Sequence, residues 1–313
     1  MKRLILTSFA FKEGYRSGVE YNANYDTYMR CCTVSLLSFK KHNAEDDVAI
    51  ATNVDIAEPY KSIFENNGIK IIRKDFTEFV FPKDFMWSLA FYKLCALKYV
   101  VEELDYDKYL MVDSDTYCIS DLYDMWNEAD GRVMLYNLQH SFSNYQSVNM
   151  REEYSKLYGT EGVMPVNYGG EFIAGDKAAL ISLIADCEAV YRRMIEKNVP
   201  TKHGDEFIVC SAVEQYGHNV RAANAYIYRY WTRRFYLVST NFEFNRISIM
   251  HLPSEKETGF AYAYKYYRRH KELPPEKKLR KMMGLPGIKT PMNLYYLRKL
   301  ILSARRKLRG KKK

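Results

Sequence analysis

Two aspartates separated by one residue, Asp113 and Asp115, carry the most distinctive chemistry in this sequence. They directly follow an apolar run, residues 109–112, which is typical of a buried strand. A bend after such a strand lets both carboxylates reach one point in space. Paired oxygen ligands suit Mn²⁺ or Mg²⁺, with the remaining coordination positions left for water and phosphate oxygens. The pattern is short, and an Asp-rich turn that only ends a strand has the same spacing.

The residues before this pair alternate between strand-like and helix-like segments. Strands are expected at residues 3–8, 48–51, 69–72 and 109–112, and helices at residues 26–41, 59–67 and 85–104. Further on, the patterns predict strands at residues 132–136, 168–174 and 247–251, and helices at residues 177–197 and 204–216. This alternation predicts an α/β fold with a mostly parallel sheet and helices on both faces. Ligands of such sheets bind beyond the carboxyl ends of the strands, where Asp113 and Asp115 would lie.

Residues 88–122, SLAFYKLCALKYVVEELDYDKYLMVDSDTYCISDL, resemble a block of glycosyltransferase family 8. This glycogenin-like family includes bacterial lipopolysaccharide glucosyl- and galactosyltransferases. Lys93 matches the basic residue of the helix in that block, and Asp113 and Asp115 match its D-x-D pair. The resemblance implies a GT-A fold, which is a Rossmann-like mixed sheet flanked by helices. It also implies a nucleotide-sugar bound through a divalent cation, with Lys93 and Ser114 beside this donor.

Two later segments are similar to the same family. Residues 166–172 stand where family members carry an Asn/Gly-rich strand beside the donor sugar, and Gly169 and Gly170 would allow close backbone approach there. This chain adds Glu171, which would be either the residue nearest the reacting carbon or a surface acid. Asp205 and Glu206 resemble an acidic segment near the acceptor, although acids in a first helical turn are also expected as partners of the helix dipole.

The resemblance assigns further roles to His251 and Lys256, which lie at and after the last predicted strand. In the family, a histidine at this place completes the metal site, and a lysine a few residues later contacts the diphosphate. A neutral imidazole nitrogen is a suitable metal ligand.

The resemblance also implies that the nucleotide base and ribose bind after the first predicted strand. Thr7 and Ser8 would offer hydroxyl groups to the nucleotide there. Tyr15 or Tyr21, in the following loop, would stack on uracil.

Positive charge is concentrated at the C-terminus. Residues 268–313 carry 17 Lys and Arg against two acids, whereas residues 1–267 carry 30 basic and 36 acidic residues. We therefore expect a catalytic domain at residues 1–267 and a basic, Pro-broken amphipathic tail at residues 268–313. Such a tail favours an anionic membrane surface, although a disordered solubilising tail or nonspecific RNA attachment has the same composition. Specific nucleic-acid binding is not expected, because the basic excess does not lie on the fold itself.

The six cysteines form no C-x-x-C pair and are scattered through apolar segments, which predicts buried free thiols in a reducing compartment. The apolar start of the chain ends by Phe11 without a cleavage site, so a first strand is expected there rather than a signal peptide. No window approaches the roughly 20 apolar residues of a membrane span. We expect a cytoplasmic protein, peripheral on the inner face of the membrane if the tail binds there.

Together these features predict a metal-dependent hexosyltransferase. It would move a hexose from a nucleotide-sugar, by resemblance UDP-linked, to a glycan or glycolipid acceptor in surface-polysaccharide synthesis. The family implies retention of anomeric configuration, but Glu171, Asp205 and Glu206 could equally include a general base for inversion.

Two other interpretations stay open. An apolar strand followed by D-x-D-x-Thr is also the nucleophile motif of haloacid-dehalogenase-like phosphatases, in which Asp113 would attack phosphorus. That motif normally lies near the start of its domain, whereas 112 residues precede Asp113 here. A non-enzymatic protein that binds a membrane or RNA through its basic tail is the second alternative.

Overall fold

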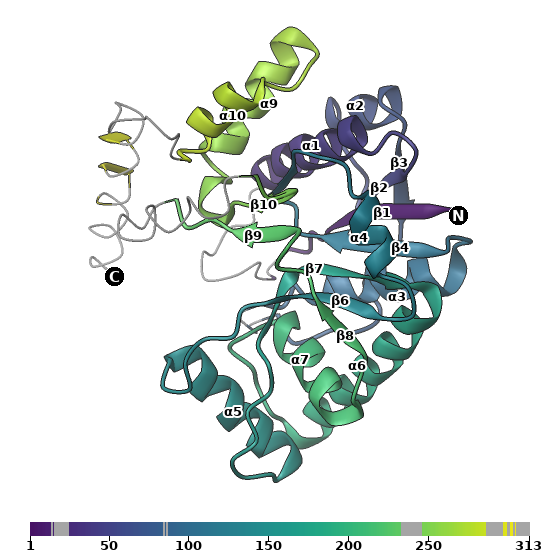
Figure 1. The fold of residues 1–313 in the computed structure, drawn as a ribbon, viewed down its shortest axis with the longest axis vertical. Coiled ribbons are helices and arrows are strands. Elements are labelled where there is room, and N and C mark those ends of the chain that lie inside the picture. The colour runs from purple at the N-terminus through teal and green to yellow at the C-terminus, as the bar shows by residue number, and fades with distance from the viewer. Residues whose placement is uncertain are drawn as a thin grey trace.

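A seven-stranded mixed sheet forms the centre of the protein, with helices on both of its faces (Figure 1). The computed structural model describes residues 1–13, 15, 25–83, 85, 87–232, 246–285, 297–298, 301–302 and 304. The strands of the main sheet are β1 (Arg3–Phe9), β2 (Asp47–Thr52), β3 (Ile69–Arg73), β4 (Lys108–Val112), β6 (Val133–Asn137), β7 (Tyr168–Asp176) and β8 (Val220–Ala222). They lie in the order β3-β2-β1-β4-β7-β6-β8, which is compatible with a Rossmann-like α/β fold.

The sheet has a parallel half and a mixed half. Strands β1 to β4 are mutually parallel, β7 is antiparallel to β4 and to β6, and β8 is parallel to β6. The chain passes from β1 to β2 on one side, and later returns from β3 to β4 on the other side of β1. Thr7 pairs with Val112, so the carboxyl ends of β1 and β4 lie side by side. Ligands bind at such switch points in open α/β sheets.

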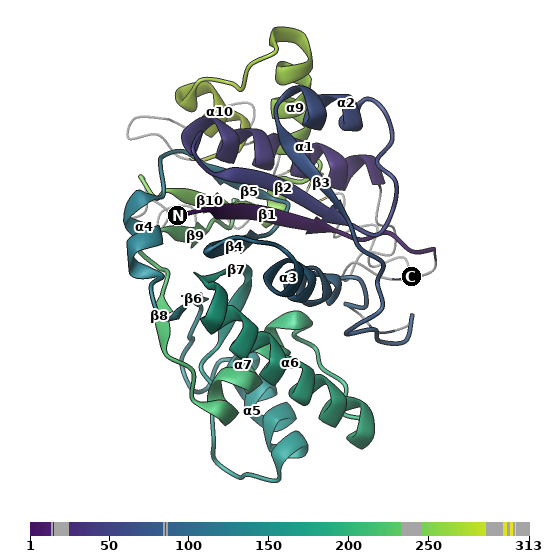
Figure 2. The same ribbon diagram turned by 90° about the vertical axis from the view of Figure 1, so that its right-hand side faces the viewer.

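The helices form two layers, one on each face of the sheet (Figure 2). One layer contains α1 (Tyr25–His42), α2 (Tyr60–Asn66), α4 (Tyr123–Glu128), α9 (Gly259–His270) and α10 (Glu276–Met282), and the other contains α3 (Tyr92–Glu103), α5 (Tyr145–Tyr158), α6 (Lys177–Lys197) and α7 (Asp205–Tyr216). Successive side chains of a strand point to opposite faces, so β4 contributes to both cores. Leu110 and Val112 pack in the core with α1 and α9, whereas Tyr109 and Met111 pack in the core with α3 and α6.

A second, small sheet lies beside the carboxyl end of β4. Its strands are β5 (Thr116–Cys118), β10 (Ile249–His251) and β9 (Ile227–Arg229), in the order β5-β10-β9. His251 pairs with Thr116 on one side and with Arg229 on the other. The 3-10 turn η2 (Pro253–Glu255) follows β10. The small sheet therefore brings three distant parts of the chain to the residues that follow β4.

The predicted helix at residues 85–104 is wrong in its first turns, because α3 begins only at Tyr92. Backbone hydrogen bonds between residues three apart, such as Ser88 N to Phe85 O, form successive turns in this segment instead. The rings of Phe81 and Phe85 stack with centroids 4.6 Å apart, and Phe81 and Phe91 lie at 4.1 Å. Packing of these rings holds the segment in turns, so tertiary contacts override its helical periodicity.

The described part of the predicted tail begins inside the fold. Helix α9 continues across residues 267 and 268, and Leu279 of α10 is buried in the core with α1. Leu297 and Ile301, apolar residues of the predicted amphipathic tail, are exposed, and most residues after 285 lie outside the described ranges. All six cysteines are buried and free. Among the described residues, no helix combines the length and apolar composition needed to cross a membrane.

Candidate metal centre

Asp113, Asp115 and His251 converge where the carboxyl end of β4 meets the small sheet. One potential ligand atom from each residue lies within 4.8 Å of the other two. His251 Nε2 lies 3.5 Å from Asp115 Oδ2 and 3.8 Å from Asp113 Oδ2. The side chains of Asp115 and His251 are buried, but that of Asp113 is 30% exposed, so the cluster is open to a ligand on that side.

The chemistry of these three groups fits a divalent metal ion. Two carboxylates and one imidazole nitrogen form a mixed oxygen and nitrogen donor set, which several divalent metals accept. The second ring nitrogen, Nδ1 of His251, lies 2.9 Å from Glu171 Oε1, and a carboxylate behind a histidine is a common partner of metal-binding imidazoles. The Asp-Asp-His cluster, of which Asp115 and His251 are buried, could therefore bind a metal ion.

Two lysines lie beside the carboxylates of this cluster. Lys93 Nζ is 2.7 Å from Asp113 Oδ1 and 2.9 Å from Asp205 Oδ2, and it donates to Gly170 O at 2.7 Å. Lys256 Nζ donates to Asp115 Oδ2. Burial lowers the pKa of both lysines, but the neighbouring carboxylates outweigh it and raise each pKa above its ordinary value. Both ammonium groups are therefore charged and adjacent to the metal position.

Two glycines of β7 make room for this arrangement. A Cβ atom at Gly170 would lie 2.5 Å from Asp205 Oδ2 and 3.1 Å from Lys93 Nζ, and one at Gly169 would collide with the Glu171 carboxylate. Gly170 N also donates to Glu206 Oε1 at 3.2 Å. The glycines are thus required by the side chains packed against the strand.

A second charged network lies behind His251. Arg229 Nε donates to Glu171 Oε1 at 2.6 Å, and its terminal nitrogen Nη2 donates to Glu171 Oε2 at 2.5 Å and Glu206 Oε1 at 2.9 Å. Burial raises the pKa of Glu171, but Arg229 and His251 outweigh it and hold that pKa far below its usual range. Burial also lowers the pKa of His251, but the Asp115 and Glu171 carboxylates raise it to about 9.

The pKa values of Asp205 and Glu206, the first two residues of α7, shift in the opposite direction to that of Glu171. Burial raises the pKa of Asp205 although Lys93 opposes this shift, and the nearby Asp113 carboxylate raises it further. Burial likewise raises the pKa of Glu206 against the effect of Arg229. Both carboxyl groups are therefore more easily protonated than ordinary side chains of their type.

Arg229 was not recognised from the sequence. It is the only charged residue in the aromatic segment Tyr-Ile-Tyr-Arg-Tyr-Trp at residues 226–231. An isolated charge in an apolar strand needs a buried partner. This isolation of Arg229 is the feature of the sequence that could have indicated its role. The partner could not be identified, because Glu171 is 58 residues away.

Three of the remaining predicted residues, Thr7, Ser8 and Ser114, belong to β1 or follow β4. Thr7 is fully buried at the carboxyl end of β1, and its hydroxyl has no hydrogen-bond partner among the residues that the structure describes. Ser8 is half-buried and Ser114 is buried. Tyr15 contacts Lys12, whose Nζ is 4.4 Å from its ring centroid, and Tyr21 lies outside the described residues.

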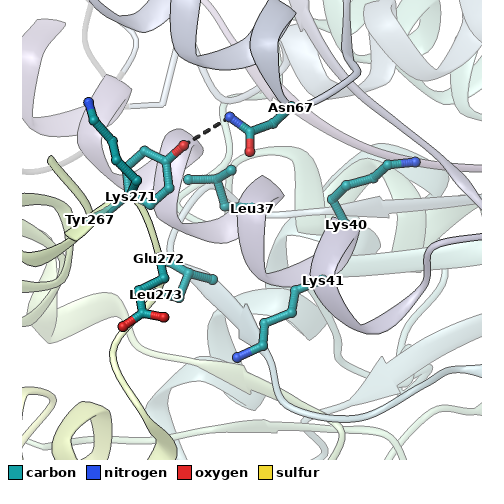
Figure 3. A pocket seen from close by; sticks show the side chains of 8 residues that line it. All are labelled: Leu37, Lys40, Lys41, Asn67, Tyr267, Lys271, Glu272 and Leu273. Carbon is teal, nitrogen blue, oxygen red and sulfur yellow. Dashed lines mark hydrogen bonds between the residues drawn. The ribbon is translucent and has the colours of Figure 1, made fainter.

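A separate cavity of about 300 Å³ lies between the C-terminal part of α1 and the end of α9 (Figure 3). It is lined by Leu37, Lys40, Lys41, Asn67, Tyr267, Lys271, Glu272 and Leu273. The end of α1 leads into the start of β2, so this cavity is at the opposite edge of the sheet from the metal centre. Figure 3 shows its three lysines pointing in different directions.

Comparison of the chain with models of known protein families gives no match, and comparison with curated proteins gives none either. Its functional interpretation therefore rests on its residues and their geometry.

Proposed function

We propose that this protein is a metal-dependent glycosyltransferase of the GT-A fold. It would transfer a hexose from a nucleotide-sugar, UDP-linked, to a glycan or glycolipid acceptor. The observation that carries this proposal is the convergence of Asp113, Asp115 and His251 within 4.8 Å, with Lys93 and Lys256 at their sides. A metal position flanked by ammonium groups suits a diphosphate, because both neutralise its negative charge.

The sheet topology supports the same proposal. A parallel Rossmann-like half, β3-β2-β1-β4, is joined through antiparallel β7 to a second half, and the D-x-D pair lies where the first half ends. This arrangement is compatible with a nucleotide-diphospho-sugar transferase, in which the nucleotide lies over the ends of β1 and β4. Ser8 would then line the nucleotide position, with Ser114 beside the diphosphate, whereas Thr7 is fully buried.

Asp113, Asp115 and His251 would hold Mn²⁺ or Mg²⁺, which as a Lewis acid would stabilise charge on the departing diphosphate. Lys256 and Lys93 would bind donor oxygens through charged hydrogen bonds. During transfer, the bond between the sugar C1 and the diphosphate oxygen breaks, and its electron pair leaves with the nucleoside diphosphate. The acceptor hydroxyl oxygen bonds to C1, and its proton passes to a diphosphate oxygen in a retaining reaction.

Asp205 and Glu206 would lie on the acceptor side of C1. With a pKa raised by burial, either carboxylate could instead take the acceptor proton as the general base of an inverting reaction. Analysis of the anomeric configuration of the product distinguishes the two reactions.

The basic tail, residues 268–313, would attach the enzyme to an anionic membrane surface on its cytoplasmic side. Its 17 Lys and Arg favour such a surface by about 1 kcal/mol for each residue close to it. Attachment there would bring the metal centre to a lipid-linked acceptor.

Calorimetric titration of UDP tests the proposed function. UDP should bind the wild-type protein with Mn²⁺ and should not bind in EDTA. Asp115→Ala should abolish the metal-dependent binding, whereas Asp55→Ala, at a fully exposed aspartate, should bind as the wild type does. Absence of UDP binding with any divalent metal would contradict the proposal. Phosphate release from phosphoesters that depends on Asp113 would then support the phosphatase alternative.

A further inference from the structure

We propose, building on the proposed metal-dependent function, that Glu171 and Arg229 act as a positioning pair that orients His251 toward the metal. Neither residue would contact the substrate. Both would act through the imidazole ring, which they hold in the orientation and tautomer that a metal ligand needs.

The two nitrogens of His251 face different partners. Nδ1 lies 2.9 Å from Glu171 Oε1, while Nε2 faces the carboxylates of Asp113 and Asp115. An ionised carboxylate can only accept a hydrogen bond, so Nδ1 must carry the proton in this contact. In the neutral ring this leaves the lone pair on Nε2, which points to the metal position. Glu171 therefore selects the nitrogen that binds the metal.

Arg229 in turn fixes the plane of the Glu171 carboxylate. Its guanidinium donates to both carboxylate oxygens, at 2.6 and 2.5 Å, and this two-bond fork allows little rotation. Arg229 is itself anchored, because it donates to Glu206 Oε1 and its backbone N donates to the hydroxyl of Tyr136 at 3.2 Å. Arg229 and His251 are also paired across β9 and β10.

Burial of Glu171 limits its carboxylate to contacts inside the protein. The side chain of Glu171 is 0% exposed and both of its oxygens accept from Arg229, with Oε1 also at His251, so neither oxygen is accessible to a substrate. Glu171 could be the residue nearest the reacting carbon on sequence grounds alone, but a positioning role agrees better with these contacts. Water cannot replace its partners at a fully buried position, so their loss is not compensated.

Mn²⁺ affinity, measured by calorimetry without nucleotide, tests the positioning role. Glu171→Gln replaces one carboxylate oxygen by an amide group that cannot accept, so either Arg229 or His251 loses its partner. We expect Mn²⁺ to bind about 10- to 100-fold more weakly, as is typical when the partner behind a metal ligand is lost. Electron spin echo spectroscopy of bound Mn²⁺ should show imidazole nitrogen coupling in the wild type, none in His251→Ala, and a weakened coupling in Glu171→Gln.

A double-mutant cycle separates positioning from a general structural effect. If Glu171 acts through His251, then Glu171→Gln should not weaken Mn²⁺ binding further in a His251→Ala background. An equal loss in both backgrounds would overturn the inference. Glu153→Gln is the matched control, since Glu153 is a buried glutamate that accepts from Thr201 and Lys202 outside the centre, and it should leave Mn²⁺ affinity unchanged.

The outcomes distinguish this inference from the proposed function. If the wild type does not bind Mn²⁺, the proposed function and the inference fail together. If the wild type binds and Asp115→Ala does not, an unchanged affinity in Glu171→Gln overturns the positioning role alone. Should Glu171→Gln not fold, Arg229→Lys provides the test, because an ammonium cannot reproduce the two-bond fork. A weaker affinity and a reduced nitrogen coupling are then expected, and unchanged values would overturn the inference.

Discussion

Lys93 and Lys256 lie in the candidate metal centre, whereas Lys40, Lys41 and Lys271 line the cavity at the other edge of the sheet (Figure 3). Lys93 is buried and Lys256 is partly buried, and both contact carboxylates that come from other elements of the fold. The cavity lysines diverge, and among the described residues Lys40 donates to the backbone oxygens of Ala44 and Asp46, each at 3.3 Å, and to no carboxylate.

The two regions differ in the structural reason for their charged residues. Lys40 and Lys41 belong to the last turn of α1, where basic residues are favoured by the helix dipole whether or not a ligand binds. In the metal centre, no single helix end explains the charges, because they come from the turn after β4, from α3, from β10 and from the residue after η2. Convergence and burial of opposite charges, rather than local positive charge, therefore point to a binding site.

Replacing one lysine in each region should produce the largest contrast. Lys256→Met removes an ammonium beside the metal position, and we expect UDP to bind roughly 10- to 100-fold more weakly with Mn²⁺, the range for one hydrogen bond to a charged group. Lys41→Met removes an exposed lysine of the cavity and should leave the affinity unchanged. Titration calorimetry measures both variants. Equal losses of UDP affinity in the two variants would show that the convergence of opposite charges does not identify the binding site.

Gly170→Ala should have an intermediate effect, confined to the metal centre. The added Cβ would meet the Asp205 carboxylate and the Lys93 ammonium, and such overpacking costs about 1–3 kcal/mol of unfolding free energy. Urea unfolding measures this cost, and UDP binding should weaken as Lys93 is displaced.

Gly131→Ala is the matched control for that substitution. Gly131 has a φ of 64° and an added Cβ meets nothing within 4 Å, so only backbone strain of about 1–2 kcal/mol is expected. Both variants should lose stability, but only Gly170→Ala should lose UDP affinity. Normal UDP binding by Gly170→Ala would argue against a tightly packed donor site.

Removal of residues 291–313 should have the smallest effect on the metal centre. We expect UDP binding and hydrolysis of UDP-sugar to be unchanged, because the site residues lie elsewhere. Binding to vesicles that contain anionic lipid, measured by cosedimentation, should decrease, and vesicles of neutral lipid serve as the control. Unchanged binding to anionic vesicles would contradict the proposed role of the tail.

Local patterns in the sequence were sufficient for much of the sheet. The predicted strands at residues 48–51 and 109–112 correspond to β2 and β4, and the predicted helix at residues 177–197 coincides with α6. These elements are long or apolar enough for their periodicity to identify them. Most of the small sheet was not predicted, because a strand of three residues is too short to show an alternation of apolar and polar side chains. Only β10 was expected, as part of residues 247–251.

The D-x-D pair and its place directly after a buried strand follow from the sequence by itself, since the apolar run at residues 109–112 is recognisable locally. Only the tertiary structure decided which distant groups meet that pair. His251 pairs with Thr116 across 135 residues of chain, and Arg229 reaches Glu171 from another strand. Contacts of this kind depend on how strands pair and pack in space, and local propensity carries no information about the partner. The buried charges behind His251 were therefore visible only once the fold brought them together.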